Sequence, residues 1–470
     1  MTTTFLLHDN SKLDPKVAKV WVAGWINAGE TSEDGKTAMQ TLLADGSFGD
    51  SRPSEVPFQL VSAVPKVSLS VATNGDDRLL FVVSDSQPTP LKVLTSKVQK
   101  KDKNGKPITV DRYDARQYTQ YPYAVAPGVA APGPFDVFEF GMNAQDNVSS
   151  VSGFGINLSF SVTINGVLEQ FGANVAMSRA AIGAAFGKFI ALEAKTLPSA
   201  TAYGDLLYDG PIKPGAPTPP LIGGQYFALS DPNDMLAALS DNYTKAIDHP
   251  LNSFWDDTLT AFFKVGNHLS INLNANPEDK KIYSGACSVQ TNPNTEVASP
   301  AFTLTRGDAS YTFYMPLKKG TTVPGQSGAQ YVFQQAFNNF TPAGAADDAG
   351  LLQDCIWEAL CRGVALDGVA TKAISQGEST TAWNDPATWY PAGKASHLYG
   401  KFLHYATIDG TDSRKGGTPI MYGNAAYGYS MDENPLGPYS GTSVPPKTYE
   451  NVPDGSTVTL VVGPWDTVLA

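Results

Sequence analysis

The pattern of apolar and polar positions predicts that the chain begins in β-strands, carries helices in its middle and returns to strands. Between residues 2 and 94, short runs rich in β-branched residues are each bounded by Gly, Asp, Asn or Pro, which is typical of strands. The runs are KVWVAGWI (19–26), PFQLVSAV (57–64), VSLSVAT (67–73) and RLLFVVS (78–84). KKDKNGKP (100–107) contains an Asn-Gly pair and predicts an exposed hairpin tip.

The middle of the chain has helical periodicity. Small and apolar residues recur at helical spacing over 178–197, and residues 350–366 place apolar side chains at i, i+3, i+4 and i+7. Residues 231–265 predict a further helical region, which Asp231 or Asp234 could cap and which Pro250 interrupts. Strands are expected again afterwards, at HLSINLN (268–274), SYTFYMPL (310–317), KFLHYATI (401–408), NAAYGYSM (424–431) and STVTLVVG (456–463).

This order of elements predicts a β-rich α+β protein. A chain of 470 residues is long enough for two domains. We expect a β-sandwich or barrel formed by residues 1–175 and 385–470, with a mixed α/β region over residues 176–384. Ligand clefts often lie where two such parts meet, so a wide groove is expected between them.

Residues 135–166 predict two strands joined by a polar loop, and the first strand carries a candidate catalytic acid. Strand alternation places Val137 and Glu139 on one face and Asp136, Phe138 and Phe140 on the other. Apolar surroundings raise the pKa of a carboxyl group, which suits a general acid. The alternative is a solvent-facing glutamate with no chemical role. Glycoside hydrolysis usually also needs a second carboxyl group across the bond.

Composition and charge narrow the ligand class. The formal net charge of −12 argues against nucleic acid and suits a neutral ligand such as a polysaccharide, although it also serves solubility alone. Cys287, Cys355 and Cys361 are expected to be buried thiols rather than ligands, and the five His residues show no metal-ligand spacing. No cofactor is therefore expected. Motifs for nucleotide binding, for a serine nucleophile elbow and for a zinc protease are not found.

Targeting signals are equally sparse. The first residues, MTTTFLLHDNSKLDPK, lack a basic segment followed by an apolar run, so no signal peptide is expected here. No apolar run approaches the length that a membrane span needs. The sequence leaves the oligomeric state open.

Phe138-Glu139-Phe140 and the strand from Asn157 to Val162 resemble the paired core strands of glycoside hydrolase family 64, the laminaripentaose-producing β-1,3-glucanases of the thaumatin-like superfamily. Further segments resemble the family over most of the chain. They are FWDDTLTAFF (254–263), CIWEALCRGVAL (355–366), HLYGKFLH (397–404), AYGYSMDENP (426–435) and STVTLVVGPW (456–465).

The resemblance implies a thaumatin-like sandwich or barrel and inverting hydrolysis of β-1,3-glucan, with Glu139 as general acid. It also implies a secreted protein. The family's general base, an Asp on the second strand, corresponds here to Val162, which strand alternation assigns to the core. Candidate replacements are Asp146, in the expected loop between the strands, and Asp432 or Glu433, which are alternatively solvated turn residues.

The resemblance also implies polar and aromatic contacts to the sugar. The candidates are Asn157, Trp383, Trp389, Tyr390, Tyr399, His404, Tyr427, Tyr429 and Asp432, and the alternative for each ring is ordinary core packing. Three functions stay open at this point: a β-1,3-glucan hydrolase with a displaced base, a glucan-binding protein that does not cut, and an interaction protein built on the same fold.

Overall fold

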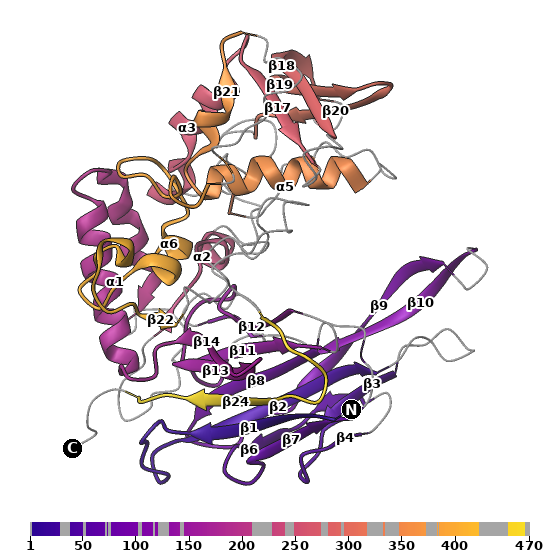
Figure 1. The fold of residues 1–470 in the computed structure, drawn as a ribbon, viewed down its shortest axis with the longest axis vertical. Coiled ribbons are helices and arrows are strands. Elements are labelled where there is room, and N and C mark those ends of the chain that lie inside the picture. Colours follow the sequence, from indigo (N-terminus) through magenta and orange to yellow (C-terminus); the bar gives the residue numbers. More distant parts are fainter. Residues whose placement is uncertain are drawn as a thin grey trace.

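The computed structural model describes residues 2–28, 38–49, 53–70, 73, 77–101, 106–115, 118–120, 131–141, 145–208, 228–239, 249–273, 281–292, 296–316, 332–333, 347–372, 383, 385–422 and 450–465. Most of the strands lie in one part of the molecule, and the helices lie beside a smaller sheet in the other part (Figure 1).

Two large sheets form the strand-rich part. The first has six strands in the order β22-β14-β13-β24-β1-β7, and the second has eight strands, in the order β23-β12-β11-β8-β2-β3-β4 with β6 paired to β2. The strands of the first sheet are β1 (Thr3–Asp9), β7 (Lys66–Leu69), β13 (Leu158–Ile164), β14 (Val167–Ala173), β22 (Met421–Tyr422) and β24 (Thr457–Val462). Those of the second are β2 (Lys19–Ala28), β3 (Ala38–Leu42), β4 (Phe48–Gly49), β6 (Phe58–Leu60), β8 (Asp77–Ser84), β11 (Phe135–Phe140), β12 (Gln145–Ser149) and β23 (Glu450–Asn451).

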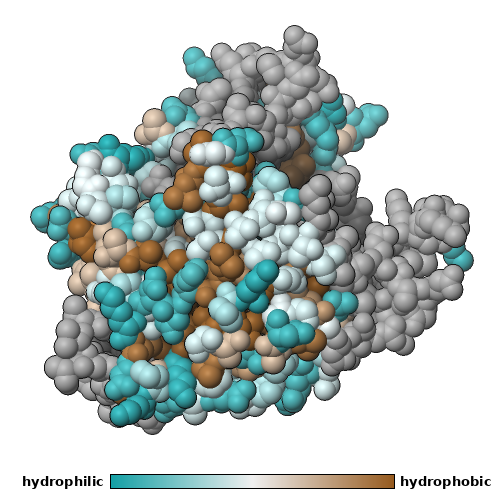
Figure 2. All heavy atoms as spheres, turned by 60° about the horizontal axis from the view of Figure 1, so that its bottom comes forward, coloured by the Kyte–Doolittle hydropathy of each residue, from teal (hydrophilic) through white to brown (hydrophobic). Residues whose placement is uncertain are grey.

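The two sheets bury a shared apolar core. Phe138 and Phe140 of β11 point into it, where the ring of Phe138 lies 5.2 Å from that of Phe160 on β13. Val162 belongs to the same core, as the sequence predicted. Val167 and Leu168, at the start of β14, are both exposed. Figure 2 shows hydrophilic and apolar side chains intermixed over the face that is turned forward.

A three-stranded sheet of β10, β9 and β5 lies against the outer face of the second sheet. Its strands are β5 (Glu55–Val56), β9 (Leu91–Lys101) and β10 (Pro107–Ala115). Lys101 pairs with Pro107, which confirms the predicted hairpin, although its turn at residues 102–105 lies outside the described residues. The ribbon projects from the body of the molecule, and its base packs on the sheet through Leu91 and Ala115 (Figure 1).

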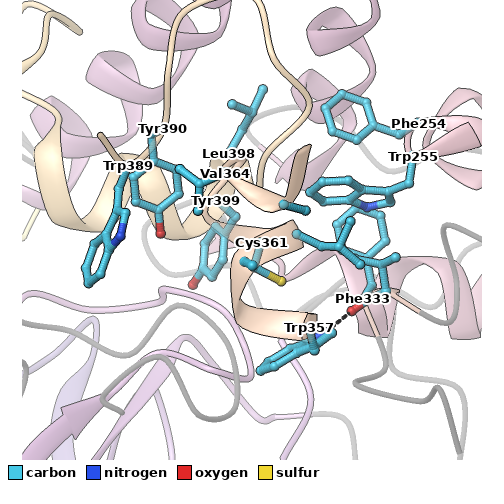
Figure 3. Close-up of a cluster of buried hydrophobic side chains, with 14 of the residues drawn as sticks. Phe254, Trp255, Phe333, Trp357, Cys361, Val364, Trp389, Tyr390, Leu398 and Tyr399 are labelled. Carbon is cyan, nitrogen blue, oxygen red and sulfur yellow. Dashed lines mark hydrogen bonds between the residues drawn. The ribbon is translucent and has the colours of Figure 1, made fainter. Parts of the chain in front are cut away.

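The second part is built around one large apolar cluster (Figure 3). Its helices are α1 (Arg179–Glu193), α2 (Pro232–Leu239), α3 (Asp256–Phe262), α5 (Asp347–Cys361) and α6 (Leu398–Tyr405). Short 3-10 turns are η1 (Pro198–Leu206), η2 (Pro250–Ser253), η3 (Ala365–Gly368) and η5 (Ser413–Lys415). Its strands are β15 (Leu207–Tyr208), β16 (Ala228–Leu229), β17 (His268–Asn272), β18 (Ile282–Thr291), β19 (Ala298–Arg306), β20 (Ala309–Tyr314) and β21 (Val369–Ala370).

Several local predictions are confirmed. Strands form over 19–28, 77–84, 268–272, 309–314 and 457–462, and helices form over 179–193 and 347–361. Asp231 caps α2, because its Oδ1 accepts hydrogen bonds from the backbone N–H groups of Asn233 and Asp234. The three cysteines are buried free thiols.

Two local predictions are wrong. The run 401–408 was expected to be a strand, but residues 398–405 form helix α6, whose first turn is capped by the His397 ring accepting from the Gly400 N–H at 3.1 Å. All eight residues of α6 are buried, so no polar face distinguishes a helical from a strand period.

The second wrong prediction is the loop expected after β11, which contains strand β12. A further prediction, the strand at 424–431, lies outside the described residues.

The division into residues 1–175 with 385–470 and 176–384 stays a prediction. The buried apolar side chains between Trp389 and Met421, however, belong to the same cluster as helices α1 and α5 rather than to the sandwich core.

The sandwich core gives a first prediction. Phe160 is buried and stacks on Phe171 with ring centroids 4.7 Å apart. Phe160→Ala should lower the free energy of unfolding by about 3–5 kcal/mol, because it removes that contact and leaves a cavity. Urea unfolding followed by circular dichroism measures the loss. Val167→Ala is the control, since Val167 is 57% exposed and its truncation should change stability by less than about 0.5 kcal/mol. Equal losses in the two variants would contradict the core position of Phe160.

Candidate functional site

Glu139 lies in a row of side chains that crosses four strands of the second sheet. It pairs with Arg78 of β8 on one side and with Asn147 of β12 on the other, and Arg78 pairs in turn with Trp25 of β2. Residues directly opposite one another on neighbouring strands place their side chains on the same face. Trp25, Arg78, Glu139 and Asn147 therefore lie side by side on the outer face of the sheet.

The guanidinium of Arg78 lies between two carboxylates. Its Nε donates to Glu139 Oε1 at 3.0 Å, and its Nη1 lies 3.7 Å from Asp114 Oδ2. The exposed fractions of the side chains are 15% for Arg78, 29% for Glu139 and 34% for Asp114. Glu139 is therefore neither fully solvated nor sealed in the interior, and it shares its cation with a second, equally accessible acid.

Asp114 reaches this row from the base of the β9–β10 ribbon. The indole N–H of Trp25 donates to Asp114 Oδ1 at 3.1 Å, and the backbone N–H of Ala115 donates to the same oxygen at 2.8 Å. The sequence analysis missed Asp114, because its only local signal was a place near the end of a hairpin strand. The contact depends on how the ribbon folds back onto the sheet.

Asp146 does not face Glu139. It lies on strand β12 and not in a loop, next to Asn147, whose side chain shares the Glu139 face. Successive residues of a strand point to opposite faces, so Asp146 points to the other side of the sheet. There it is buried, accepts from the Gly141 N–H at 3.3 Å, and has its pKa raised, first by burial and then by the nearby charges of Asp77 and Glu450.

Asp136 of β11 has a structural position. It is buried and accepts hydrogen bonds from the backbone N–H groups of Gly155 and Ile156, at 3.0 and 2.7 Å, and from the hydroxyl of Ser150. Burial raises the pKa of Asp136 to about 8, although these donors and the charge of Arg179 act in the opposite direction. The carboxyl group thus joins β11 to the chain that leads into β13.

The residues expected to contact sugar are placed in the interior. Trp383, Trp389, Tyr390, Tyr399 and His404 are each at most 3% exposed. Figure 3 shows Trp389, Tyr390 and Tyr399 within the cluster that also holds Trp255 and Trp357. Rings buried to this extent present no face to a polysaccharide, so their positions give no support to the predicted contacts.

The other residues expected to contact sugar either have partners within the protein or lie outside the described residues. Asn157 is buried, and its side-chain amide donates to the carbonyl of Met177 at 2.7 Å. The Tyr399 hydroxyl donates to the carbonyl of Ser150, and Arg362 stacks over the Trp389 ring. The remaining candidates lie outside the described residues: Tyr427, Tyr429, Asp432 and Glu433.

Within the described ranges, no group of three or more His, Cys, Asp or Glu side chains is arranged to hold a metal ion. Among the helices of those ranges, none combines the length and apolar character needed to cross a bilayer.

Comparisons with known proteins identify the fold. The sequence matches no family model and no curated protein. The structure is similar to a β-1,3-glucanase domain of glycoside hydrolase family 64 from Clostridium beijerinckii, with a TM-score of 0.56, 13% identity and 98% of each chain covered. The chain has a GH64-like fold.

A family 64 laminaripentaose-producing β-1,3-glucanase from Paenibacillus barengoltzii is a second structural neighbour, with a TM-score of 0.46, 13% identity, and 98% of this chain and 75% of that chain covered. Over its described residues, this chain is β-rich and has several sheets, none of which is closed.

Asp136 gives a second prediction. Between its ordinary pKa of 3.8 and its folded value of about 8, the folded protein holds a proton that the unfolded chain releases. The protonated Asp136 therefore stabilises the folded protein. This stabilisation is fully present below pH 4 and is lost as the pH rises toward 8. The free energy of unfolding of the wild type should therefore fall, relative to that of Asp136→Asn, when urea unfolding is repeated from pH 5 to pH 8. Parallel pH profiles would show that Asp136 keeps an ordinary pKa.

Proposed function

We propose that this protein hydrolyses β-1,3-glucan and that Glu139 is the general acid of the reaction. The observation that carries the proposal is the structural likeness to a β-1,3-glucanase domain over 98% of both chains. The partly exposed carboxyl group of Glu139, on the strand whose F-E-F pattern resembles that of family 64, supports it further. The proposal includes a thaumatin-like sandwich and a sugar-binding groove beside this strand.

In the proposed reaction Glu139 gives a proton to the glycosidic oxygen as the C1–O bond breaks, and water adds to C1. One oxygen of the carboxyl group, Oε1, is held by Arg78. Oε2 makes no hydrogen bond to any of the described residues, so it is the oxygen that we assign to the substrate. General acid catalysis of this kind contributes roughly 10² to 10⁴-fold to a rate.

Glucan binding without cleavage is a second candidate, and one observation favours it. Val162, which stands where family 64 carries its base, is buried in the sandwich core and leaves no space for a water-activating carboxylate there.

Hydrolysis is tested directly with laminarin. The wild type should release reducing oligosaccharides, and Glu139→Gln should lower kcat by about 10² to 10⁴-fold with little change in KM, because the amide preserves shape but cannot supply a proton. Glu55→Gln is the matched control: Glu55 is an exposed strand carboxylate on β5 that is not part of the row, and its loss should leave the rate unchanged.

Binding is measured in parallel by sedimentation with insoluble β-1,3-glucan. Binding by a wild type that releases no sugar would replace hydrolysis with the second candidate. A wild type that neither binds nor cleaves would remove β-1,3-glucan as the ligand. Full activity of Glu139→Gln would remove this residue from the mechanism while leaving the activity in place.

A further inference from the structure

We infer that Asp114 is the second carboxylate of the reaction, so that the base lost at position 162 is supplied by the β9–β10 ribbon. The inference rests on the proposed hydrolysis and names the group that activates water in it. The observation behind it is that Asp114 and Glu139 flank one guanidinium on the outer face of the second sheet.

The separation of the two carboxyl groups has an upper limit that is compatible with this role. Glu139 Oε1 lies 3.0 Å from Arg78 Nε and Asp114 Oδ2 lies 3.7 Å from Arg78 Nη1, and one planar guanidinium carries both nitrogens, so these oxygens are at most about 9 Å apart. Inverting glycoside hydrolases hold their two carboxyl groups roughly 6.5 to 9.5 Å apart, which leaves room for a water molecule beside the sugar. Asp146, on the opposite face, has no comparable relation to Glu139.

Asp114 is oriented as a base needs to be. Both of its hydrogen-bond donors, the Trp25 indole and the Ala115 N–H, bind Oδ1. Oδ2 lies beyond hydrogen-bond distance of Arg78 and makes no hydrogen bond within the described part of the chain. Each carboxyl group of the pair therefore has one anchored oxygen and one oxygen open to a ligand: Oδ2 of Asp114 and Oε2 of Glu139.

Arg78 is the positioning residue for both acids. It is the most buried of the three side chains and contacts each carboxylate from the sheet. Without this cation, two carboxylates at such a distance would repel each other in a half-buried environment. The ribbon strand β10 and the sheet strand β11 are thereby held together at the site by charge as well as by the apolar contacts at the ribbon base.

The reaction balances with these groups alone. Water attacks C1 of the sugar and its proton passes to Asp114 Oδ2, while the proton on Glu139 Oε2 passes to the leaving oxygen as the C1–O bond breaks. One water molecule is consumed, and both acids regain their starting states by exchanging a proton with solvent. The product carries the inverted, α configuration at C1.

The test compares Asp114→Asn, Glu139→Gln, Glu55→Gln and wild type on laminarin and on 2,4-dinitrophenyl β-laminaribioside. Dinitrophenolate leaves without protonation, so Glu139→Gln should recover most of its rate on this substrate. Asp114→Asn should stay about 10² to 10⁴-fold below wild type on both substrates, because water is still not activated.

Added sodium azide distinguishes a lost base from a lost fold. Azide needs no deprotonation and should raise the rate of Asp114→Asn on the dinitrophenyl substrate by at least about tenfold, releasing α-laminaribiosyl azide, with no such effect on Glu139→Gln. Rescue proves that the variant is folded. Proton magnetic resonance of the first product formed by the wild type should show the α anomer.

The outcomes separate the two proposals. A wild type that cleaves both substrates while Asp114→Asn keeps its rate, or a wild type that releases the β anomer first, overturns the role of Asp114 as base and leaves the hydrolysis standing. A variant that stays inactive with azide also counts against this role. A wild type that cleaves neither substrate overturns the hydrolysis and the role of Asp114 together.

Discussion

The strand register of the second sheet decides which charged groups meet at the site. Phe138 and Phe140 are buried between the sheets, so the strand period of two places Glu139 on the outer face, opposite Arg78. A slip of one residue would bury the carboxylate among phenylalanine rings and expose those rings to water. Because an unpaired buried charge costs several kcal/mol, this register is strongly preferred, and the row of polar side chains follows from it.

The features that the sequence predicted correctly are those that depend on a short stretch of chain. The faces of β11, the core position of Val162 and a cap of α2 by Asp231 or Asp234 all follow from residues within one element, and the structure selects Asp231. The contacts that make the candidate site do not. Trp25 and Asp114 are 89 residues apart along the chain, and Arg78 and Glu139 are 61 apart. Such pairs depend on how sheets and ribbon pack, and no periodicity within one segment encodes that.

The aromatic residues show that residue type alone does not tell a sugar-binding ring from a core ring. Trp389, Tyr390 and Tyr399 have the side chains that a sugar site would use, yet the same side chains fill the core around α5 and α6. Residue type does not separate the two uses, because a ring that could stack on a pyranose also buries a large apolar area. Only the packing around α6, all of whose residues are buried, assigns these rings to the interior.

The arrangement of Glu139, Arg78 and Asp114 also bears on the difference between binding and cleavage. Two carboxylates with one free oxygen each can accept hydrogen bonds from sugar hydroxyls without any proton transfer. Hydrolysis demands more, since one acid must donate a proton while the other accepts one. Arg78 does not contact the two acids equally: it lies 3.0 Å from Glu139 but 3.7 Å from Asp114. This asymmetry matches the two different roles that hydrolysis requires, whereas binding alone needs no difference between the two acids.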